Sequence, residues 1–108
     1  MYESIQANRI LDLPSDDTWS DGTAGGLEEE SITFEICKQY VDEWVLVKED
    51  EIAASLSYLM DKHYWMVEGA AALALAALRK NPAPFQGKKL ALILCGRKMS
   101  QEKLRKLL

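Results

Sequence analysis

Apolar residues recur at helical spacing in several segments of the chain, and typical helix-start and helix-stop residues flank these segments. Residues 1–8 predict a short helix. Residues 13–26 predict a loop, because this stretch is rich in Pro, Ser, Asp, Thr and Gly. Ser31 is the expected N-cap of a helix over residues 32–40. The apolar face of this helix is expected to consist of Ile32, Ile36, Cys37 and Tyr40.

Three further helices are expected in the second half of the chain. The acidic run at 49–51 favours the N-terminus of a helix that ends near His63, because negative charge is stabilised at that end. A helix of nearly pure alanine and leucine follows over residues 69–80, and Asn81-Pro82 stops it. Ser100 is expected to cap a last amphipathic helix. The buried positions of the first and last of these helices are Ile52, Leu56, Leu59 and Met60, and Leu104, Leu107 and Leu108.

Two segments, residues 41–47 and 88–95, lack helical spacing and are apolar on both faces, as expected of buried parallel strands. The order of the elements predicts an α/β fold, in which a small parallel sheet with a right-handed crossover is flanked by helices as part of a three-layer arrangement. Ligands of such sheets bind beyond the carboxyl ends of the strands. The expected ligand edge therefore contains Cys95, Gly96, Arg97 and Lys98.

A sheet of two strands leaves its edges unpaired, and the Ala/Leu helix has more apolar perimeter than so small a sheet can cover. Either further chain, such as an N-terminal domain, is missing from this sequence, or a second copy covers these surfaces. The expected partner is the chain itself, in a homodimer or a higher homo-oligomer. Trp19, Trp44 and Trp65 are expected in core or interface packing rather than in a pocket.

Composition limits the classes of function. The chain of 108 residues is expected to form one domain, residues 1–108, and its net charge of −4 argues against nucleic-acid binding. No apolar stretch approaches the roughly 20 residues that cross a membrane. Cys37 and Cys95 are far apart, as expected of reduced thiols in a cytoplasmic protein. His63 is the sole histidine and is expected at the surface, so no metal site is predicted.

Glu68 stands at the mouth of the Ala/Leu helix. A carboxylate at this place has two interpretations. It caps the helix N-terminus, where negative charge is favoured, or it faces a ligand cavity at the same end.

Five short motifs follow one another in the chain: TWSDGTAGG at 18–26, VDE at 41–43, VKEDEI at 47–52, VEGAA at 67–71 and LILCG at 92–96. This series resembles the C-terminal third of threonine and serine dehydratases. These are pyridoxal-phosphate enzymes of the tryptophan-synthase β-like fold, a group that includes serine racemase. The resemblance covers essentially the whole chain.

The resemblance implies roles for four residues. Cys95 falls where such enzymes carry the Ser or Cys that hydrogen-bonds the pyridine nitrogen of the cofactor, and Gly96 continues that motif. Glu68 matches a glutamate close to the cofactor ring, and Gly22 lies in a loop of the active-site wall. Arg97-Lys98 departs from the family pattern, which has a second Gly and an Asn at these positions.

The family carries its Schiff-base lysine, its substrate-carboxylate loop and its phosphate cradle in the part that precedes these motifs. The resemblance therefore predicts no catalytic residue and no bound cofactor in the isolated chain, and Glu68 is then expected mainly to cap its helix. The expected function is that of a non-catalytic, self-associating stand-alone fragment of a threonine/serine dehydratase (ammonia-lyase). The alternatives are a subunit completed by a separate N-terminal part, or a small-molecule-binding oligomeric module.

Overall fold

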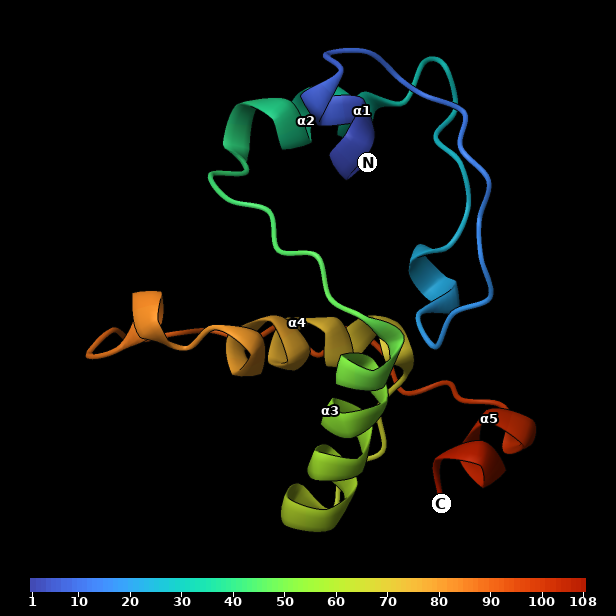
Figure 1. The fold of residues 1–108 in the computed structure, drawn as a ribbon, viewed down its shortest axis with the longest axis vertical. Helices are drawn as coiled ribbons and strands as arrows, with labels where there is room; N and C mark the ends of the chain where they lie inside the picture. Colours follow the sequence, from blue (N-terminus) through green and yellow to red (C-terminus); the bar gives the residue numbers. More distant parts are fainter. The chain divides into compact units, whose positions relative to one another are not determined.

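The computed structural model describes residues 1–108 as five α-helices and two short 3-10 helices, with no residue in a β-strand. Two compact units contain these elements (Figure 1). The first unit, Met1–Asp16 with Ala24–Val45, holds α1 (Tyr2–Gln6) and α2 (Ile32–Tyr40). The second unit, Asp17–Thr23 with Leu46–Leu108, holds η1 (Asp21–Thr23), α3 (Glu49–His63), α4 (Gly69–Lys80), η2 (Ala83–Phe85) and α5 (Gln101–Leu107). None of the helices has the length and apolar character that crossing a bilayer requires.

The core of the second unit lies between α3 and α4, which run across each other in Figure 1. Alanines on α4 let the two backbones approach closely, because their side chains add little thickness to the contact. The fully buried residues of this core are Ile52, Leu56, Leu59, Val67, Ala71 and Ala72. Trp19, Val47, Leu94, Met99 and Leu107 pack against it and are partly buried, so the sequence on both sides of the two helices contributes to one core.

Most helix ends agree with the predicted start and stop signals, although Ser31 precedes α2 without a side-chain capping hydrogen bond. Ser100 caps α5, and its hydroxyl accepts a hydrogen bond of 3.1 Å from the Lys103 backbone N–H. Glu51 accepts a 2.6 Å hydrogen bond from the Lys48 backbone N–H at the start of α3. His63 is exposed and is the last residue of α3, as expected, and the helix ends because Tyr64 takes a left-handed conformation with φ 56°.

An ion pair also holds the first turn of α3 to the end of α4. Lys80 Nζ lies 3.0 Å from the Glu51 carboxylate and donates a 2.8 Å hydrogen bond to the Leu46 carbonyl. The hydrogen bond from the Lys48 backbone lowers the pKa of the Glu51 carboxyl below its ordinary value, and the hydrogen bond from Lys80 lowers it further. The carboxylate is therefore favoured in its charged form by the folded geometry.

The predicted α/β fold is wrong for this chain, because neither expected strand forms. Residues 41–47 and 88–95 carry no regular secondary structure, and no ladder of hydrogen bonds pairs them with a strand. Most of their apolar side chains are also exposed, Ile93 by 72%, and only partial burial is reached by Val47 and Leu94, which pack against the core. An apolar sequence pattern indicates that a segment is suited to burial. A β-strand forms only where a second strand pairs with its backbone N–H and C=O groups.

In the first unit, the predicted buried face of α2 is wrong. The buried residue of this helix is Phe34, whereas Ile32, Ile36 and Tyr40 are exposed and Cys37 is half-buried. Ser4 is the other buried residue of the unit, and its hydroxyl accepts a 3.1 Å hydrogen bond from the Leu11 backbone N–H. Burial in this unit therefore does not follow the longest apolar stripe of α2.

Candidate functional site

Three of the four residues singled out in the sequence meet around one carboxylate. A Cβ added at Gly96 would overlap the Glu68 carboxylate, so this carboxylate lies directly against the Gly96 Cα. A Cβ added at Gly22 would lie 3.6 Å from Glu68 Oε1 and 3.3 Å from the Ala70 Cβ. The Glu68 backbone N–H donates a 3.1 Å hydrogen bond to the Gly96 carbonyl, which fixes the two chain segments side by side. We call this set of Gly22, Glu68 and Gly96 the carboxylate cluster.

Glu68 is the N-cap residue of α4, as expected, but its side chain does not do the capping. The first helical hydrogen bonds, 3.1 and 3.2 Å long, run from the Ala71 and Ala72 N–H groups to the Glu68 backbone carbonyl. The half-buried carboxylate makes no capping hydrogen bond and instead lies between the two glycines. The position at the helix mouth is thus confirmed, whereas the capping role of the carboxylate is wrong.

Cys95, the fourth residue, is a free thiol and is exposed. It precedes Gly96 in the extended segment that follows η2. The side chain is therefore reachable from solvent in this chain and is not packed as a small core residue, in contrast to the buried strand that was expected there.

Polar contacts that were not foreseen hold the glycine-bearing segment 17–23 in place. The Glu49 carboxylate accepts 2.7 Å hydrogen bonds from the Thr18 hydroxyl and from the Trp19 backbone N–H. From α5, Lys103 Nζ donates a 2.7 Å hydrogen bond to the Thr18 carbonyl and lies 3.2 Å from the Asp21 carboxylate. No local sequence pattern signals these contacts, because Lys103 is 85 residues away from Thr18 in the chain.

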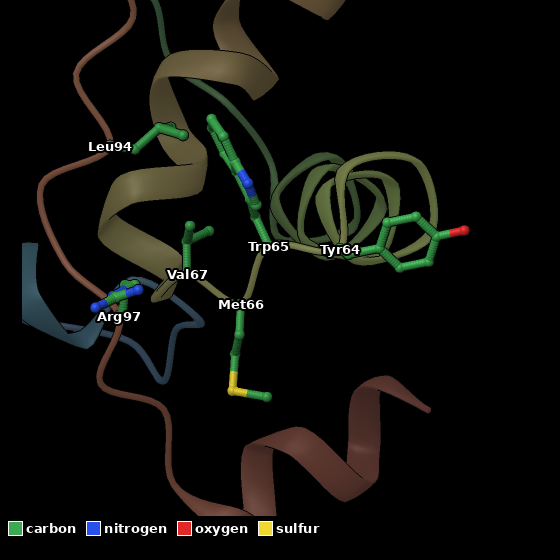
Figure 2. A pocket seen from close by; sticks show the side chains of 6 residues that line it. All are labelled: Tyr64, Trp65, Met66, Val67, Leu94 and Arg97. Atoms are coloured by element: carbon green, nitrogen blue, oxygen red, sulfur yellow. The ribbon is translucent and has the colours of Figure 1, made fainter.

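A pocket of about 560 Å³ lies next to the carboxylate cluster, since Val67 and Arg97 of its lining are the sequence neighbours of Glu68 and Gly96. Its lining comes from the link between α3 and α4 and from the segment before α5 (Figure 2). The lining residues are Tyr64, Trp65, Met66, Val67, Leu94 and Arg97. Arg97 was expected at the ligand edge, whereas Trp65 was expected in core or interface packing and is 56% exposed. No local sequence signal identifies the pocket, because the left-handed turn at Tyr64 that separates the aromatic residues from α3 is visible only in the structure.

The donor set of the four residues is a thiol, a carboxylate and two glycines. A thiol can contact the ring of a pyridine cofactor, but a thiol, a carboxylate and two glycines supply no positive charge to hold a phosphate group. By themselves, these residues therefore do not fit the whole pyridoxal-phosphate group.

Comparison with known proteins gives the family. The model of a family described as "Pyridoxal-phosphate dependent enzyme" matches residues 1–96. An L-threonine ammonia-lyase of Thermotoga maritima is 35% identical over 96 residues, which are 89% of this chain and 23% of that protein. The biosynthetic L-threonine dehydratase IlvA of Pasteurella multocida is 32% identical over 107 residues, which are 97% of this chain and 21% of that protein.

Solved structures agree with this assignment. A threonine deaminase from the organism abbreviated T.th. superposes with a TM-score of 0.81 at 31% identity, over 91% of this chain and 35% of the other. A serine racemase from Dictyostelium discoideum has a TM-score of 0.78 at 28% identity, over 92% of this chain and 31% of the other. The chain spans less than a quarter of the length of the two curated relatives. Since the family model covers 1–96 of the 108 residues, the chain belongs to the pyridoxal-phosphate dependent enzyme family.

Proposed function

We propose that this chain is a portion of a threonine/serine dehydratase type of enzyme that is non-catalytic on its own and associates with further copies of itself. The observation that carries the first half is coverage: nearly all of this chain aligns with an L-threonine ammonia-lyase, yet it spans only 23% of that protein. A hydroxy amino acid is the substrate class that the names of the relatives point to.

The chemistry of the site supports the same proposal. Cys95 and the carboxylate cluster offer contacts to one side of a cofactor ring, in keeping with the roles that the resemblance implies. A complete site also needs a phosphate-binding loop and an amine nucleophile with a perturbed pKa. The carboxylate cluster carries the wrong charge for the first of these, so this chain needs a complementary polypeptide to form the site.

Catalysis is tested by adding pyridoxal phosphate and L-threonine or L-serine to the purified chain and measuring ammonia release. We expect release at the rate of a control that contains the cofactor without protein. Faster ammonia release than in the control, lowered again by a Cys95→Ala substitution, would contradict the proposal. The activity would then belong to this chain's own site.

A second candidate is a subunit completed by a separate polypeptide, and the same low coverage favours it. The test is co-expression with the part of the Thermotoga maritima relative that this chain does not match. Ammonia release from L-threonine that depends on both polypeptides would establish this candidate. A complex that forms without any release would argue against it.

Self-association is motivated by segment 88–95, which carries no regular secondary structure. Its apolar side chains Leu90, Leu92 and Ile93 are all exposed, and its backbone N–H and C=O groups have no strand partner. An exposed apolar segment with open backbone groups is a template for pairing with another chain. A two-fold interface would use the segment from both copies at once.

The matched variants for this test are Ile93→Lys and Ile32→Lys, because the two isoleucines are similarly exposed, by 72% and 77%, and lie in different units. Burial of such a side chain contributes about 1.5–3 kcal/mol, so Ile93 would contribute about 1–2 kcal/mol per copy and about 2–4 kcal/mol per dimer. We expect Ile93→Lys to raise the dimer Kd roughly 30- to 900-fold.

Sedimentation over a concentration series measures this effect. We expect Ile32→Lys to leave the Kd of the native chain unchanged. A native chain that stays monomeric at every concentration would refute self-association, and equal effects of the two variants would refute the role of segment 88–95.

A further inference from the structure

The pocket beside the carboxylate cluster has the size and the build of a small-molecule site. Its volume of about 560 Å³ falls within the range of about 300–1,000 Å³ that is typical of ligand pockets. Five of its six lining residues are aromatic or apolar, and one is charged. Ligand pockets commonly combine a mainly apolar wall with few polar groups that orient the ligand.

The apolar wall is anchored in the core of the second unit. Val67 is buried in the α3–α4 core, and Leu94 packs against that core. The Trp65 backbone N–H donates a 3.1 Å hydrogen bond to the Leu59 carbonyl, which ties the pocket segment to the end of α3. Val67 and Leu94 are thus fixed by the core, whereas Trp65 and Met66 are held at the backbone and keep exposed side chains.

Arg97 is the single charged residue of the lining, and Figure 2 shows its side chain near Val67. None of the ion pairs of the chain involves Arg97, although Glu68 lies against the neighbouring Gly96. An Arg guanidinium stays protonated at all ordinary pH values and presents a planar set of donors that matches a carboxylate. An unpaired guanidinium at the rim of an apolar pocket favours an anion with an apolar body.

We infer that this pocket binds a small aromatic carboxylate, with the carboxylate on Arg97 and the ring against Trp65, Met66 and Leu94. An indole and a thioether both interact well with a planar ring, which is why the inferred body is aromatic rather than extended aliphatic. This site stands independently of the proposed function, because it needs only the second unit and neither a companion polypeptide nor a second copy.

The test compares phenylacetate with phenylacetamide, which has a similar shape and no charge. Binding to the full chain is followed by NMR through the Trp65 indole N–H signal, assigned with a Trp65→Phe variant. We expect phenylacetate to shift this signal in a saturable way. We expect phenylacetamide to bind about tenfold more weakly, at the low end of what hydrogen bonds to a charged group contribute.

Two variants separate the role of Arg97 from general charge. Arg97→Met keeps an apolar stem and removes the guanidinium, and we expect it to abolish the preference for phenylacetate. Lys98→Met removes the neighbouring cation, which does not line the pocket, and we expect it to keep the preference. Amide spectra of both variants report whether the fold is retained.

Three outcomes would overturn the inference. The first is equal binding of the acid and the amide to the native chain. The second is an unchanged preference in a folded Arg97→Met variant. The third is inorganic phosphate that competes as well as phenylacetate, because the pocket would then bind anions without using its apolar wall.

Discussion

The first residue of α4 is a glycine at which the helix touches the backbone of another segment. A Cβ at Gly69 would overlap the Trp19 carbonyl group and lie 2.9 Å from the Ser20 backbone nitrogen. We predict that Gly69→Ala destabilises the chain, although the same change inside an unobstructed helix is worth up to about 1 kcal/mol of stability. The obstacle is backbone, which cannot rotate away as a side chain can.

The magnitude follows from two opposing effects. Overpacking costs about 1–3 kcal/mol, and the shift that relieves it moves segment 17–23 away from α4. This shift also strains the two hydrogen bonds that Thr18 and Trp19 donate to Glu49, each of which contributes about 1 kcal/mol. After the helix gain is subtracted, we expect a loss of about 2 kcal/mol, which for a chain of this length lowers Tm by roughly 8 °C.

Thermal and urea unfolding followed by far-UV circular dichroism measures the loss. Gly96→Ala is the matched control, because its Cβ would meet the flexible end of the Glu68 side chain instead of backbone. We expect this control to change stability by less than about 0.5 kcal/mol. A Gly69→Ala midpoint equal to or above that of the native chain would refute the reasoning, and so would equal losses in the two variants.

Three further changes test the packing and the charge contacts of the second unit. Leu56→Ala leaves a cavity at a side chain that is 1% exposed and should cost about 2–5 kcal/mol in urea unfolding, whereas a loss below about 1 kcal/mol would argue against the α3–α4 core. Lys103→Met should lower stability by about 1 kcal/mol and should speed amide exchange at Trp19, and unchanged exchange would contradict the anchoring of segment 17–23. The lowered pKa of Glu51 stabilises the folded state fully above pH 4.5, and this contribution is lost as the pH falls through the lower pKa of the folded state. Glu51→Gln should therefore flatten this part of the profile of unfolding free energy against pH. A slope in the variant equal to that of the native chain would contradict the role of Glu51.

The helices were predictable from the sequence because their signals are local. Ser31 and Ser100 stand directly before α2 and α5, and the acidic run opens α3 where the peptide dipoles favour negative charge. Hydrophobic spacing in α3 also identified Ile52, Leu56 and Leu59 as core residues, whereas Met60 is half-buried. The predicted burial of Leu108 beside α5 is wrong, because this side chain is 87% exposed. Each of these signals lies within one or two turns of the helix it specifies.

The expected strands failed for the opposite reason. Apolar residues at 41–47 and 88–95 satisfy the pattern of a buried strand, but pairing depends on backbone groups that come from elsewhere. The predicted face of α2 was also wrong, because the apolar spacing along this helix did not single out Phe34, its one buried residue.

By itself, the sequence determined the approximate bounds of the longer helices, the α3 side of the α3–α4 core, and, through its ordered motifs, the enzyme family. Only the tertiary structure decided that the Glu68 carboxylate lies between Gly22 and Gly96 rather than on its own helix end. It also decided that Lys103 holds Thr18 and that Arg97 meets Trp65 at one pocket. Capping and periodicity are short-range properties of the chain, whereas these contacts join residues that only the folded path brings within hydrogen-bond or van der Waals distance.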